Sequence, residues 1–156
     1  MVVRDGRTLA PTFASLGAIY TWRMPCSQKD AETVVAAAHA KARELGIQVT
    51  VAVVDEGGLL QVLSRMDGAP PISAQIAEAK AAGAALWHRE GDSLAQVQQQ
   101  RPAFFTQVDR LARLPIMPGE GSLLMRRGDA ILGAVGVSGG TPAQDRECAQ
   151  AGIDKL

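Results

Sequence analysis

The sequence predicts an α+β domain in which an antiparallel sheet is flanked by helices. Two observations carry this prediction: two stretches have the strand-turn-strand pattern of a β-hairpin, and the segments around them have apolar residues at helical spacing. The order along the chain is helix, hairpin, helices, hairpin, helix. The 156 residues suit a single domain, which we place at residues 26–156, with residues 1–25 as an N-terminal extension of weak structural signal.

The first helix and the first hairpin are predicted from the change of apolar period. Ser27 and Asp30 form an approximate capping box ahead of the first helical pattern. Residues 49–54 are β-branched and almost all apolar, residues 55–58 are typical of a turn, and residues 59–65 return as the second strand.

The middle of the chain is predicted to be helical. Ser73 is the expected N-cap of a helix that runs to about Trp87. This helix is so rich in alanine that a sheet or a neighbouring subunit can approach it closely, although alanine is also simply the best helix former. Two shorter helices are expected to start near Asp92 and at Pro102.

A second hairpin and a last helix complete the domain. Residues 122–126 and 130–137 are the expected strands. Thr141 is the expected N-cap of the last helix, and Gln144 completes its capping box before a run to about Ile153.

Composition excludes several classes of partner. Sixteen Lys and Arg balance sixteen Asp and Glu, so no global field attracts nucleic acid, and an aromatic content of 4% argues against stacking platforms for bases. A net charge of zero also removes repulsion between copies and favours a homo-oligomer.

The expected location of the protein in the cell follows from its cysteines and apolar runs. Two cysteines in positions without zinc-ligand spacing indicate a reducing compartment, and we expect a cytoplasmic protein. The longest apolar stretch is too interrupted to span a membrane, so no membrane partner is expected. The first 25 residues weakly imitate a signal peptide, but Asp5 and Pro11 argue against one.

The glycine-rich junction before the last helix is the strongest candidate binding feature. Gly139, Gly140 and Thr141 lead from a strand into a helix N-terminus, where free N–H groups and the helix dipole favour a carboxylate or phosphate. The alternative is structural: the glycines permit close packing and a tight turn.

Three further side chains are candidates for acid–base or binding chemistry. Arg65 and Asp67 lie on the same side of a strand, either as a carboxylate clamp and a base or simply as an ion pair. Lys80 stands alone among small residues, either as a catalytic lysine if it is buried or with its charge in solvent.

Two histidines lie on predicted helices. His39 or His88 is a possible haem ligand or proton carrier, and each also suits an ordinary surface or capping role.

Five segments of the sequence, taken together, carry a resemblance to a known family. They are Asp30 to Glu32, Val51 to Gly58, Arg65 to Ala69, Ala77 to Ala81, and Gly133 to Gly140. In order and spacing they resemble the GlcG/HbpS family, which includes the C-terminal domain of PduO proteins, across about residues 28 to 153. The resemblance implies a profilin-like sandwich, assembly into homo-oligomers such as octamers, and haem or a related tetrapyrrole as ligand in some members. A first-helix histidine that binds haem in PduO-type domains favours His39 as the metal ligand.

Glu120 is a departure from the family pattern in the loop before the second hairpin. Its charge either opposes haem propionates or supplies a catalytic carboxylate. It therefore separates the leading hypothesis from its alternative.

The leading hypothesis is an oligomeric protein that binds a small molecule, with haem as its cofactor, His39 on the iron, and Arg65 and the Gly139 to Thr141 junction on carboxylates. The alternative is an isomerase, hydratase or lyase acting on a small organic acid, in which Asp67, Glu120 or Lys80 moves protons. The sparse aromatic residues favour such a compact polar substrate over a porphyrin. A scaffold without a ligand is the third possibility.

Overall fold

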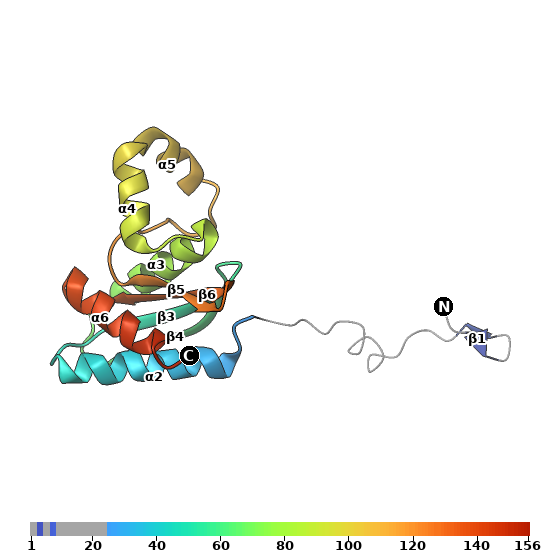
Figure 1. Ribbon diagram of the computed structural model, residues 1–156, viewed down its shortest axis with the longest axis horizontal. Coiled ribbons are helices and arrows are strands. Elements are labelled where there is room, and N and C mark those ends of the chain that lie inside the picture. The colour runs from blue at the N-terminus through green and yellow to red at the C-terminus, as the bar shows by residue number, and fades with distance from the viewer. Residues whose placement is uncertain (1–2, 5–6, 9–24) are drawn as a thin grey trace.

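The computed structural model describes residues 3–4, 7–8 and 25–156 (Figure 1). Two short strands near the N-terminus, β1 (Val3–Arg4) and β2 (Arg7–Thr8), pair antiparallel. Most of the segment that imitates a signal peptide lies outside the described residues.

Four antiparallel strands form the central sheet, in the order β4-β3-β6-β5. They are the two predicted hairpins, joined through the pairing of β3 with β6. The strands are β3 (Thr50–Asp55), β4 (Leu60–Arg65), β5 (Ser122–Arg127) and β6 (Ala130–Ser138). The predicted α+β class with an antiparallel sheet flanked by helices is thus confirmed.

Helices cover both faces of this sheet (Figure 1). One face is covered by α2 (Gln28–Glu44) and α6 (Pro142–Ile153), which pack side by side. The other is covered by α3 (Ser73–Trp87), and α4 (Gly91–Gln100) and α5 (Pro102–Asp109) lie beyond α3.

Both predicted capping boxes are present. Ser27 accepts a hydrogen bond from the Asp30 backbone at the start of α2, and Thr141 does the same for Gln144 at the start of α6. The predicted N-cap role of Ser73 is wrong: Ser73 is already helical, and its hydroxyl instead donates to the Pro70 carbonyl.

The alanine-rich helix α3 packs against the sheet at close range. Its side chains are buried nearly all the way round. A Cβ atom at Gly136 on β6 would clash with the Ala77 carbonyl oxygen and lie 2.7 Å from the Ala81 nitrogen. The small residues on both sides therefore let the helix backbone approach the strand, which is the sheet-packing alternative predicted for this helix.

Candidate functional site

Three of the predicted site residues meet in one hollow. His39, Arg65 and Asp67 line a space of about 430 Å³ between α2 and the end of β4. We call it the His39 hollow. Its other lining residues are Arg43, Gln48, Ser64 and Met66.

Two elements bring these side chains together. His39 and Arg43 are four residues apart on α2, so they lie on one side of the helix, one turn apart. Arg65 is the last residue of the edge strand β4, and the chain turns directly after it, with the Ala69 N–H donating to the Met66 carbonyl at 3.1 Å. The hollow therefore lies where the helix passes the end of the sheet edge.

His39 is a buried, neutral imidazole. Its residue is 8% exposed, and its Nε2 lies 3.2 Å from the Ser64 carbonyl oxygen. Burial lowers the pKa of His39 and nearby Arg43 lowers it further, while the hydrogen bond to Ser64 acts in the opposite direction. Because a carbonyl only accepts, the proton sits on Nε2 and the lone pair on Nδ1.

The two arginines of the hollow are exposed and positively charged. The Arg65 guanidinium makes a long 3.4 Å hydrogen bond to the Ala69 carbonyl. Within the described ranges, no ion pair joins Arg65 to Asp67, so the simple pairing alternative does not hold for them. These guanidinium groups can therefore receive a carboxylate from a ligand.

The glycine-rich junction already binds a carboxylate from its own helix. The Gly140 N–H donates to Asp145 Oδ1 at 2.9 Å, and the Thr141 N–H donates to the Gln144 side chain at 3.0 Å. Burial raises the pKa of Asp145, and the Gly139 and Gly140 backbones, with Lys80, act to lower it. The anion-binding chemistry predicted for Gly139, Gly140 and Thr141 is thus used within the chain.

Lys80 is buried, as its catalytic hypothesis required, but its ammonium group is paired with a buried carboxylate. Its Nζ lies 2.9 Å from Asp145 Oδ2 and donates to the Val137 carbonyl oxygen at 2.8 Å. The side chains of Lys80 and Asp145 are 10% and 5% exposed. The alternative with its charge in solvent is wrong, because the long side chain reaches from α3 past β6 to α6.

Glu120 lies apart from the His39 hollow. It is half-buried in the loop before β5, between Gly119, whose N–H donates to the Gly91 carbonyl, and Gly121, which packs against Asp145. The structure therefore brings together His39, Arg65 and Asp67 in the His39 hollow. It joins Lys80 to the glycine junction elsewhere, through Asp145.

The sequence did not single out Arg43 or Asp145 as site residues. Arg43 had a signal, since it follows a candidate histidine by one helical turn. Asp145 is paired with a lysine 65 residues away, and no local pattern reveals that contact.

Two kinds of feature are not found among the described residues. In residues 3–4, 7–8 and 25–156, no group of three or more His, Cys, Asp or Glu side chains is placed to hold a metal ion. In the same ranges, no helix has the length and apolar character needed to cross a membrane.

Comparison with known proteins gives consistent matches. The family model that describes HbpS-like haem degrading proteins matches residues 26–154. Protein GlcG of Escherichia coli K12 is 40% identical over 114 residues, 72% of this chain and 80% of GlcG. The corrinoid adenosyltransferase PduO of Salmonella typhimurium is 32% identical over 124 residues, 80% of this chain but only 37% of PduO.

Solved structures agree with these matches. A complex described as PduOC with heme is 28% identical, with a TM-score of 0.76 over 84% of this chain and 94% of that one. A double mutant of HbpS from Streptomyces reticuli is 28% identical, with a TM-score of 0.78 over 96% of this chain and 99% of that one.

Proposed function

Since the chain belongs to the family of HbpS-like haem degrading proteins, we propose that it binds haem in the His39 hollow. The GlcG/HbpS resemblance seen in the sequence is confirmed by this membership. The similarity to a PduOC structure solved with heme supports haem as the ligand class.

The observation that carries the proposal is a neutral histidine beside two arginines. His39 is kept uncharged by burial, so its imidazole offers a nitrogen lone pair to iron without first losing a proton. His39 is the proposed iron ligand. When bound, the haem iron supplies redox and small-ligand chemistry that side chains lack.

The arginines suit the acidic edge of haem. A guanidinium forms paired hydrogen bonds with a carboxylate, and Arg65 and Arg43 line the same hollow as His39. We assign the propionates to these two side chains. Asp67 lines the same hollow without an ion pair to Arg65, and we do not assign it to the propionates, because two carboxylates repel each other.

A second copy of the chain is proposed to complete the site. A tetrapyrrole requires broad apolar contact, yet among the described residues Met66 is the sole apolar one that lines the His39 hollow. A homo-oligomer, an octamer in the form proposed here, would cover the exposed face of the ring. The net charge of zero removes repulsion between copies, and the buried free thiols of Cys26 and Cys148 support a cytoplasmic location.

A haemin titration tests the proposal. We expect a Soret shift that saturates at about one haemin per chain, and an affinity at least about tenfold lower in His39→Ala, equal to roughly 1.4 kcal/mol. His88→Ala is the matched control, because His88 is exposed at the end of α3 and lies outside the hollow. A titration without a Soret shift, or an equal loss in His88→Ala, would refute haem ligation by His39.

Arg65→Gln separates the propionate contact from iron ligation. It should weaken haemin binding while preserving the position of the Soret band, since the iron ligand is unchanged. A Soret band displaced in Arg65→Gln as it is in His39→Ala would contradict this division of roles.

A further inference from the structure

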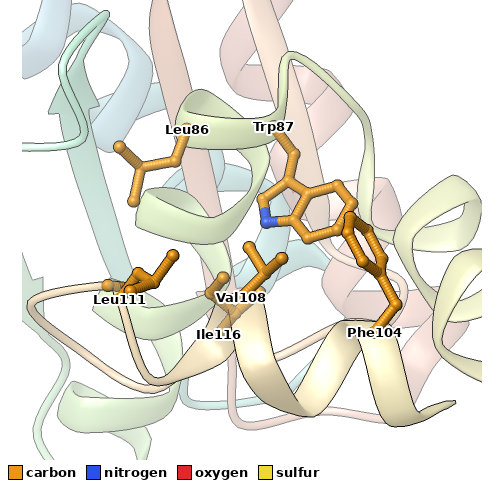
Figure 2. Close-up of a pocket in the computed structure, with 7 residues that line it drawn as sticks. Leu86, Trp87, Phe104, Val108, Leu111 and Ile116 are labelled. Carbon is orange, nitrogen blue, oxygen red and sulfur yellow. The ribbon is translucent and has the colours of Figure 1, made fainter.

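A second hollow lies on the other side of the sheet from α2, between the end of α3 and α5. Figure 2 shows it, and we call it the Trp87 hollow. Its volume is about 380 Å³, and it shares no residue with the His39 hollow. It is lined by Leu86, Trp87, Phe104, Val108, Leu111, Ala112 and Ile116.

The side chains that line the Trp87 hollow are apolar except for one polar atom, the indole nitrogen of Trp87. The indole nitrogen of Trp87 lies on the side of its ring that faces Leu86 and Val108 (Figure 2). In the part of the chain that the structure describes, no protein group accepts this N–H, which is open to solvent in the hollow and not sealed in the interior. A tryptophan placed in an apolar site ordinarily finds a hydrogen-bond partner for its N–H, so the hollow presents one unused donor.

The walls of the Trp87 hollow are held in place. Trp87 stacks on Phe105 with ring centres 5.6 Å apart, and it meets the edge of Phe104 at 6.1 Å. By contrast, Leu111 on the rim is 85% exposed. A rigid aromatic wall with an uncovered apolar rim is typical of a preformed ligand site.

Positive charge borders this hollow. The Arg101 guanidinium lies 4.2 Å from the centre of the Phe104 ring. The nearby carboxylate of Asp109 is turned inward, where its Oδ1 accepts the Ile116 N–H at 2.6 Å. The rim therefore offers a cation to a ligand, while the acidic group is engaged by the backbone.

We propose that the Trp87 hollow binds a small aromatic carboxylate, independently of haem. The apolar body would lie between Trp87 and Leu111, with an oxygen accepting the indole N–H and the negative charge attracted by Arg101. The volume suits a ring system of one or two rings.

Binding of 2-naphthoate, followed by the indole ¹H–¹⁵N resonance, tests the proposal. The sequence has two tryptophans, so the Trp22→Phe background leaves only the Trp87 signal. We expect a saturable downfield shift of this signal. Trp87→Phe, followed by calorimetry, should weaken binding about fivefold, as loss of one hydrogen bond predicts.

Two variants separate the hollow from a general apolar surface. Leu111→Asp adds a carboxylate at an exposed rim position and should weaken binding about tenfold. Leu156→Asp, at another exposed leucine near the C-terminal end of α6, should leave binding unchanged. The neutral 2-naphthamide should bind about threefold more weakly than 2-naphthoate, and Arg101→Gln should abolish that difference.

Three results would overturn the proposal. One is a Trp87 resonance that does not move with 2-naphthoate at millimolar concentration. Another is equal weakening by Leu111→Asp and Leu156→Asp. The third is an oligomer that Leu111→Asp dissociates, with 2-naphthoate binding only after dissociation, which would assign this surface to a second copy. His39→Ala should leave 2-naphthoate binding intact, so failure here is separate from failure of haem binding.

Discussion

Removing the Lys80 ammonium should strongly destabilise the fold. Lys80→Met keeps an unbranched side chain but leaves the Asp145 carboxylate, whose side chain is 5% exposed, with the glycine backbone as its remaining partner. Breaking one side of a buried ion pair costs about 3–5 kcal/mol. The lost hydrogen bond to the Val137 carbonyl belongs to the same cost, because it also leaves a buried acceptor unpaired.

Urea denaturation at pH 7 measures this effect as a lower midpoint with an unchanged slope. The double variant Lys80→Met/Asp145→Asn should recover part of the loss, because the amide oxygen can still accept the Gly140 N–H and carries no charge. Glu78→Gln is the matched control, since its ion pair with Arg113 is exposed and worth less than about 1 kcal/mol.

The pH dependence gives an independent check. Burial raises the pKa of Asp145 above its usual 3.8, so the folded state binds its proton more tightly than the unfolded state. The loss of unfolding free energy caused by Lys80→Met should therefore shrink as the pH falls through the folded-state pKa of Asp145 towards 3.8. A loss below about 1 kcal/mol at pH 7, or no recovery in the double variant, would refute a paired buried charge.

Three further predictions follow from individual contacts. Gly136→Ala should destabilise the fold by about 1–3 kcal/mol or more in urea denaturation, because the added methyl group meets the backbone of α3. The control Gly57→Ala should cost less, because its added Cβ would lie 3.3 Å from its nearest neighbour, Asp55 Oδ1, and equal costs would contradict the close approach of α3 to β6. Because burial depresses the pKa of His39, its contribution to the free energy of unfolding is present above pH 6.5 and should be lost as the pH falls through the folded-state pKa. The free energy of unfolding of His39→Gln should fall less across this range, and a pH profile identical to that of the wild type would contradict a buried neutral His39. Burial raises the pKa of Cys26 and of Cys148 to about 11, so neither thiol should react with a disulfide reagent at pH 8 until the protein unfolds, and rapid labelling of the native protein would show an exposed thiolate.

Local signals accounted for most of the fold. The capping residues Ser27 and Thr141 contact backbone N–H groups three residues away, so the sequence predicts both helix starts. The change from helical to alternating period likewise predicts both hairpins. The predicted N-cap of α3 was wrong by one residue, because the Ser73 hydroxyl bonds to the Pro70 carbonyl of the preceding turn and to the Thr50 hydroxyl and does not cap the helix.

The candidate site was only partly predictable, because packing sets it. The sequence singled out His39 and Arg65 separately, but their meeting depends on how α2 lies against the edge strand β4. The glycine junction had the correct chemistry for a carboxylate. The carboxylate that binds there belongs to Asp145, four residues after Thr141. The sequence of a helix start does not reveal whether a ligand or a side chain of the same helix accepts its free N–H groups.

The distribution of buried charge is the reason why we propose the His39 hollow as a place for an anion. Asp55 accepts hydrogen bonds from its own turn, at Gly57 and Leu59, and Lys80 pairs with Asp145. These buried charges thus have partners inside the chain, and they add no attraction for a ligand. The exposed guanidinium groups at the His39 hollow differ, because a ligand carboxylate can approach them from solvent without breaking a buried pair. A chain of net charge zero can therefore still attract an anion locally, since attraction depends on which charges the fold leaves facing outward and not on their total.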